Sequence, residues 1–210
     1  MCQEVFQIVQ GMDKKHIETK LALQCAPLIT GIKISNLLIV SSEDEESVRT
    51  ILRKTGISYY RLLRQEKKTT FLLFYRSKLC TYLKDSDVQN ILLENDYQDL
   101  SFGMILRQFQ MRYKAYMNQE AQFPHEMGVL LGYPVEDVRG FIEHKGQNFL
   151  YSGYWKVYQD VAQKKALFAK YEEAKETLIR LLDCGIGIRL IIEIYREDFM
   201  VDLQEKKEVA

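Results

Sequence analysis

Two β-rich runs joined by a short polar turn constrain the fold of this chain most strongly. Ile57–Arg64 and Thr69–Arg76 are rich in leucine, aromatic and β-branched side chains, and Gln65–Lys68 between them is polar. Such a pair of runs is typical of an antiparallel hairpin. Upstream, the apolar run Ile32–Val40 predicts a further buried strand. The first half of the chain therefore predicts a small, mostly antiparallel sheet.

Helical patterns surround and follow these strands. In the clearest of them, Ser101–Met117, aromatic, Leu and Met side chains recur at helical spacing. Ser42 and Glu45 have the spacing of a capping box at the start of another helix. The remaining helices are predicted from about Lys14 to Cys25, from Ser77 to Leu83, from Ser86, from Pro124 to Leu131, from Pro134 to Lys145 and from Asp160 to Cys184. The fold class predicted is α+β, a small sheet packed with helices and followed by a helical second half.

The last apolar segment alternates in a different way. Ile188, Leu190, Ile192 and Ile194 lie at every second position, which favours a strand over a helix. We expect one α+β domain over residues 1–204, with no internal repeat. Within it we expect a sheet-rich half over 1–100, a helical half over 101–184 and a C-terminal strand over 186–195, followed by a frayed tail over 205–210.

Charge excludes one broad class of function. The chain has 29 Lys and Arg residues against 29 Asp and Glu residues, and no basic cluster stands out. Binding to nucleic acid or to an anionic membrane is usually carried by a clustered basic excess. We therefore expect neither as a partner.

Cysteine usage and hydropathy point to the cytoplasm. Cys2, Cys25, Cys80 and Cys184 lie far apart, which argues against a disulfide scaffold or a four-cysteine zinc site. The start of the chain lacks the basic and apolar regions of a signal peptide, and the longest aliphatic run, Leu37–Val40, is too short to span a bilayer. We expect a cytoplasmic protein, and the sequence indicates no metal site and no particular cofactor.

The most motif-like stretch is Phe123–Asp160. It contains the triplet Pro124-His125-Glu126 and the run Leu131-Gly132-Tyr133-Pro134. With Gly153–Tyr158 further on, these residues resemble a family of uncharacterised proteins found mainly in anaerobic Gram-positive bacteria, whose hallmarks are Pro-His-Glu and Leu-Gly-Tyr-Pro. Cys25-Ala26-Pro27 and Gly31–Leu37 resemble the same family. The resemblance implies no activity, and suggests at most a setting in anaerobic redox or metal physiology.

His125 and Glu126 are the first candidate site residues. Adjacent positions on a helix point about a hundred degrees apart, so the two side chains do not face one another. His125 can take part in ligand binding, proton transfer or metal binding, or it can hydrogen-bond a neighbouring loop. Glu126 in a first helical turn is equally explained by the helix dipole.

The loop after the second Pro-initiated helix is the other candidate surface. Lys145, Asn148, Tyr154, Trp155 and Lys156 combine cations with flat aromatic faces, which suits an anionic, ring-bearing ligand. The same composition suits a loop whose aromatic residues fill a core.

Two family-like positions earlier in the chain complete the set. Cys25 can be a reactive thiolate or a buried, inert thiol. Lys33, just before a strand, can bind an anion or protect a sheet edge.

Three functions remain open from the sequence. The first is a ligand-binding or accessory protein, with an anionic aromatic molecule or a redox protein as its partner. The second is a small-molecule enzyme in which His125 or Glu126 transfers a proton while Lys145 or Lys156 holds an anion. The third is a protein-interaction module that uses the aromatic surface around Trp155.

Overall fold

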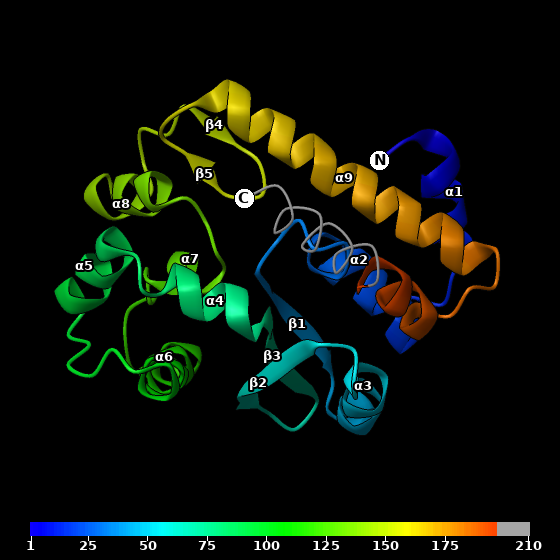
Figure 1. The fold of residues 1–210 in the computed structure, drawn as a ribbon, viewed down its shortest axis with the longest axis horizontal. Helices are drawn as coiled ribbons and strands as arrows, with labels where there is room; N and C mark the ends of the chain where they lie inside the picture. Colours follow the sequence, from blue (N-terminus) through cyan, green and yellow to red (C-terminus); the bar gives the residue numbers. More distant parts are fainter. Residues whose placement is uncertain (197–210) are drawn as a thin grey trace, which may run out of the picture.

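The computed structural model describes residues 1–196 and confirms the α+β class (Figure 1). Its three-stranded sheet consists of β1 (Ser35–Ser41), β2 (Ile57–Arg64) and β3 (Lys68–Tyr75), in the order β1-β3-β2 with antiparallel neighbours. The predicted hairpin is β2 and β3, and the predicted upstream strand is β1. The local turn and the β-rich composition therefore identified the three strands, and the structure adds their order.

Helices provide most of the rest of the described structure. The labelled helices are α1 (Gln3–Gly11), α2 (Ile17–Ile29), α3 (Glu45–Leu52), α4 (Arg76–Tyr82), α5 (Ser86–Glu94), α6 (Phe102–Met117), α7 (Met127–Leu130), α8 (Val135–Glu143) and α9 (Val161–Asp183), with a 3-10 turn, η1 (Ser42–Asp44), before α3. Residues 188–196 are also helical. A two-stranded hairpin, β4 (Tyr151–Ser152) and β5 (Lys156–Val157), precedes α9. The sequence did not predict α1.

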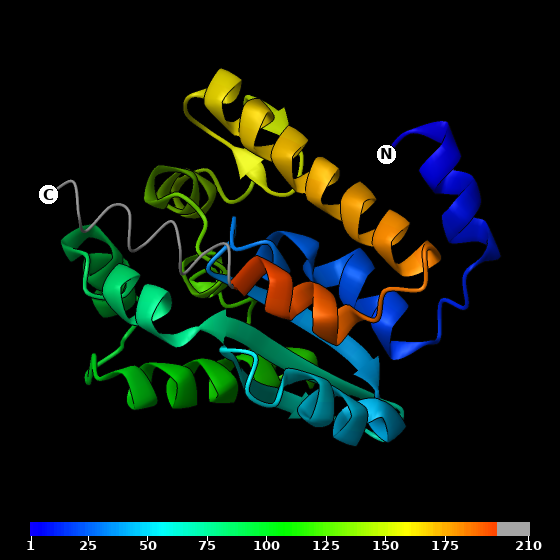
Figure 2. The same cartoon turned by 45° about the vertical axis from the view of Figure 1, so that its right-hand side comes forward.

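The sheet lies between two helical layers because its strands are apolar on both faces. Leu38, Phe71 and Leu73 belong to a core shared with α2, α3 and α9. Leu72 and Phe74 belong to a second core shared with α4 to α8. Figure 2 shows α2, in blue, and α6, in green, on opposite sides of the sheet.

The C-terminal strand predicted over residues 186–195 is wrong, because residues 188–196 are helical. Ile188, Ile191 and Ile192 are buried in the first core, whereas Leu190 and Ile194 are exposed. The buried positions follow the spacing of a helix and not that of a strand. The tail predicted over 205–210 lies outside the described residues.

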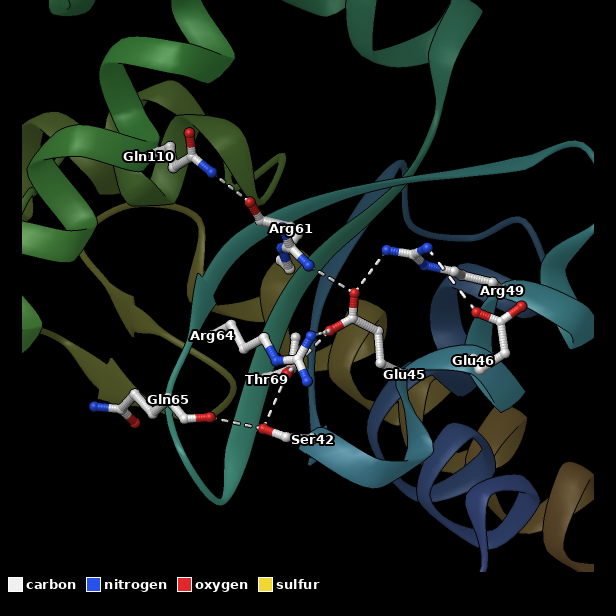
Figure 3. Close-up of polar contacts among 9 residues, drawn as sticks. All are labelled: Ser42, Glu45, Glu46, Arg49, Arg61, Arg64, Gln65, Thr69 and Gln110. Atoms are coloured by element: carbon white, nitrogen blue, oxygen red, sulfur yellow. Dashed lines mark hydrogen bonds and ion pairs between the residues drawn. The ribbon is translucent and has the colours of Figure 1, made fainter.

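A bulge in β2 brings two of its arginines to a carboxylate that a third arginine, from α3, also approaches (Figure 3). The register shifts between Arg61 and Leu63. A bulge inserts one residue and redirects the side chains after it, so Arg61 and Arg64 both reach Glu45, at 2.8 and 3.7 Å. Arg49 approaches the same carboxylate to 2.7 Å.

This arrangement replaces the expected capping box. The Ser42 hydroxyl donates to the carbonyl of Gln65 at 2.8 Å and does not cap α3. Burial alone would raise the pKa of Glu45, but the hydrogen bond from Arg61 and the surrounding guanidinium charges lower it below its usual value. Glu45 therefore joins α3 to the edge strand β2.

We expect Glu45→Gln to lower the free energy of unfolding by about 1–2 kcal/mol at neutral pH, because three guanidinium groups then lack their shared anion. The carboxylate contributes stability above pH 4.5, where it is ionised in the unfolded chain, and that contribution disappears as pH falls through its lower folded value. The difference between variant and wild type in urea unfolding should therefore shrink on acidification. Glu46→Gln is the matched control, because Glu46 is 82% exposed and lies 3.9 Å from Arg49. An equal loss in both variants would contradict this role.

Candidate functional site

A cavity of about 230 Å³ lies where the turn before α7, helix α8 and the β4–β5 hairpin meet. Its walls are mainly aromatic and aliphatic, with three polar members, His125, Asp137 and Lys156. The other lining residues are Phe123, Met127, Gly128, Tyr133, Val138, Phe141, Tyr154 and Trp155. Segments thirty residues apart in the chain thus contribute to one hollow.

A turn, and not a helix, presents His125. The amide of Met127 donates to the carbonyl of Pro124 at 2.9 Å, and α7 begins only at Met127. The imidazole lies between the rings of Phe123 and Phe141, at centroid distances of 5.6 and 5.4 Å. Its Nδ1 is buried and has no hydrogen-bond partner among residues 1–196.

Glu126 does not line the cavity. Its carboxylate is fully buried, accepts hydrogen bonds from Nε and Nη2 of Arg112, and accepts one from the hydroxyl of Tyr97 at 3.1 Å. The two neighbours in the Pro-His-Glu triplet therefore serve different regions. His125 faces the cavity, whereas Glu126 joins the turn to α6.

Asp137 anchors the hairpin to α8. One carboxylate oxygen accepts the indole N–H of Trp155 at 2.7 Å, and the other accepts the backbone N–H of Tyr158 at 2.8 Å. Gly140, one turn further along α8, permits this approach, because a Cβ there would lie 2.6 Å from Cβ of Tyr158. The buried carboxylate is thereby satisfied by N–H donors.

Trp155 forms one wall and is only 9% exposed. Its ring stacks on Tyr133 at 4.7 Å and meets Phe168 of α9 edge-on at 4.5 Å. The exposed Tyr154 beside it donates its hydroxyl to Glu172. Trp155 therefore belongs to a packed cluster and does not form an exposed aromatic patch.

Lys156 supplies a cation at the cavity. Its ammonium donates to the carbonyl of Gly146 and lies 4.9 Å from the ring of Phe149 and 5.7 Å from that of Phe141. In the described part of the chain it has no ion-pair partner. An ammonium has three N–H donors, so donors remain for a ligand.

Lys145 and Asn148 are not brought to the cavity. Both lie in the exposed turn after α8, with φ of 51° and 54°. Neither residue lines the cavity, although Lys156 contacts Gly146 of the same turn.

Cys25 and Lys33 lie behind the cavity wall. The ammonium of Lys33 is 5.1 Å from the ring centroid of Tyr133 and donates to the side chain of Asn36 at 2.7 Å. The Asn36 amide approaches Cys25 Sγ at 3.6 Å. Burial lowers the pKa of Lys33 to about 8 and raises the pKa of Cys25 to about 12. Cys25 is thus a protonated, buried thiol.

Sequence reasoning missed several lining residues on α8. Asp137 and Val138 lie four and three positions before Phe141, so each is a neighbour of Phe141 on the helix surface. That spacing, read together with the adjoining His125 turn, was the signal that could have identified them.

Among residues 1–196, no cluster of three or more His, Cys, Asp or Glu side chains could hold a metal ion. Within the same residues, no helix has both the length and the apolar character needed to cross a membrane.

Comparison with known proteins gives one match. A family model described as "Protein of unknown function (DUF3793)" matches residues 21–192, which include the sheet and every residue that lines the cavity. No curated protein and no solved structure matches the chain significantly.

Proposed function

Since the chain belongs to the DUF3793 family, whose function is unknown, we propose a function from its own residues: it is a cytoplasmic protein that binds a small, ring-bearing anion in this cavity. The observation that carries the proposal is the meeting of His125 and Lys156 at one aromatic-walled hollow. The setting in anaerobic redox or metal physiology rests on the family resemblance alone, and no residue of the cavity selects it.

The walls favour a planar ligand. Phe123, Phe141 and Trp155 offer rings for stacked or edge-on contacts with another ring. The volume of about 230 Å³ is smaller than the ~300–1,000 Å³ typical of pockets for drug-sized molecules. A ligand of one or two rings suits this space.

The polar groups favour a negative charge on that ligand. The ammonium of Lys156 lies against aromatic rings without a carboxylate partner among residues 1–196. The unpartnered Nδ1 of His125 offers a further hydrogen-bonding group. A carboxylate bound between them would accept from the ammonium of Lys156, and from Nδ1 of His125 in the tautomer that carries its proton there.

The other two functions receive less support. An enzyme that uses Glu126 would need that carboxylate in the cavity, but Arg112 and Tyr97 already satisfy it elsewhere. A protein-interaction surface would need Trp155 exposed, but it is packed against Tyr133 and Phe168.

Trp155, the chain's only tryptophan, provides a direct test. We expect benzoate and phenylacetate to change its fluorescence on binding, and benzyl alcohol to bind at least ten-fold more weakly. In Lys156→Met we expect the affinity for the acids to fall at least ten-fold, or about 1.4 kcal/mol, with no change for the alcohol. His125→Gln should weaken acid binding to a smaller extent.

Lys165→Met is the matched control, because Lys165 is exposed, lies over the ring of Tyr151 and does not line the cavity. Equal losses in the Lys156 and Lys165 variants would remove the assigned role of Lys156. Absence of any fluorescence response or thermal stabilisation across the acids would overturn the proposed function.

A further inference from the structure

A second cavity adjoins the first. It has a volume of about 480 Å³ and shares Phe123 and His125 with the cavity described above. Its other lining residues are more polar and come largely from α6 and the loop after it: Asn95, Met111, Arg112, Ala115, Ala121 and Gln122. The Phe123–His125 turn therefore borders both cavities, of which the first is mainly aromatic and the second has more polar lining residues.

Arg112 is the main polar group of the second cavity. Glu126 accepts from its Nε and Nη2, while its Nη1 makes no hydrogen bond among residues 1–196. The side chain is 36% exposed, whereas Glu126 is fully buried. A guanidinium held along one edge by a buried carboxylate is pre-oriented to donate from its other edge.

The ion pair also limits what this cavity attracts. Because the charge of Glu126 offsets that of Arg112, the cavity offers directed N–H donors more than a strong positive field. The amides of Asn95 and Gln122 add further hydrogen-bonding groups. Such a set selects an oxyanion by geometry, since a guanidinium presents N–H groups in a fixed, planar arrangement.

We infer that a single ligand spans both cavities: an aromatic acid with its ring in the first, and a second acidic group, a carboxylate or a phosphate, held by Arg112 in the second. His125 lies at the junction, because it lines both cavities. This inference rests on the proposed function and deepens it, because it specifies two acidic groups at opposite ends of the ligand.

The test compares one monoacid with two diacids by titration of Trp155 fluorescence. Phenylacetate is the monoacid, and the diacids are 1,4-phenylenediacetate and 4-(carboxymethyl)phenyl phosphate. We expect at least one diacid to bind the wild type ten-fold or more tightly than phenylacetate. The diacid with the larger gain in affinity shows whether the second cavity prefers a carboxylate or a phosphate.

Two variants test whether the higher affinity of the diacids comes from the second cavity, and both keep Arg112, which stabilises the fold. Ala121→Phe should fill the second cavity and reduce diacid affinity to that of phenylacetate, leaving phenylacetate unchanged. Gln122→Leu should reduce the diacid gain partially. Ala169→Phe, at an exposed position on α9 away from both cavities, is the control for added bulk.

The outcomes separate the two proposals. Equal affinity for monoacid and diacids, or a diacid gain that persists in Ala121→Phe, would overturn the spanning ligand while leaving the first cavity as a binding site. If none of the three acids binds, the proposed function fails and this inference fails with it.

Discussion

Arg112→Met is expected to lower the free energy of unfolding by about 3–5 kcal/mol at neutral pH, because it leaves a fully buried carboxylate without its cation. Glu126 is enclosed by the turn before α7, and Arg112 of α6 is its ion-pair partner among residues 1–196. The hydroxyl of Tyr97 donates to it as well, but a neutral donor cannot offset the cost of burying the charge. Urea denaturation monitored by circular dichroism measures the loss.

Two comparisons test that explanation. Arg107→Met removes an exposed arginine from the same helix and should change stability by less than about 0.5 kcal/mol. Adding Glu126→Gln to Arg112→Met should recover part of the loss, since the stranded charge is then absent. A loss below about 1 kcal/mol in Arg112→Met would show that the charge of Glu126 is compensated in another way.

Lys33 should make a large contribution to the pH dependence of stability. In the unfolded chain its ammonium titrates near 10.5, whereas burial lowers the folded pKa to about 8. Below pH 8 both states are protonated, and the folded state bears the cost of the buried charge. Between pH 8 and 10.5 the unfolded chain binds more protons than the folded one, so the contribution of Lys33 to stability rises with pH. The difference between the two pKa values corresponds to about 3 kcal/mol.

Lys33→Met therefore should gain stability relative to wild type at pH 7, and that gain should shrink by up to about 3 kcal/mol by pH 10.5. Loss of the hydrogen bond to Asn36 reduces the gain, and more at pH 7, where the donor is a charged ammonium. Paired urea unfolding curves at pH 7 and pH 10 measure the change, because tyrosines and Cys25 titrate in both proteins. Lys170→Met, at an exposed position on α9, is the control. A constant difference across this range would contradict the buried-charge explanation.

Elements determined by interactions between residues close in sequence were predicted correctly, whereas an element determined by contacts with distant residues was not. The hairpin β2–β3 and helix α6 were predicted from local signals, a polar turn in one case and a repeated apolar face in the other. Residues 188–196 were not, because Ile188, Leu190, Ile192 and Ile194 alternate while Ile188, Ile191 and Ile192 also fit a helix. Only contact with the core shared with α2 selects between these two patterns.

The candidate site residues show the same contrast between local and distant interactions. The sequence singled out His125 and Lys156 as candidates, and the structure places both at one hollow. The destinations of Glu126 and Lys33 depended on Arg112 and Tyr133, which are not their sequence neighbours. Side-chain direction at such positions is set by tertiary partners, and a single sequence carries little record of them.

The cavity can be completed during synthesis only after helix α9 has been made. At 1.5 Å per residue it is about 34 Å long. Its early residues Phe168 and Tyr171 support Trp155, and its later residues Ala174 and Leu178 enter the core with α2. The two-residue strands of β4 and β5 are too short to hold a tryptophan by themselves. A nascent chain that has emerged from the ribosome only as far as Lys156 would carry all the residues that line the cavity, yet it would lack the helix that supports Trp155.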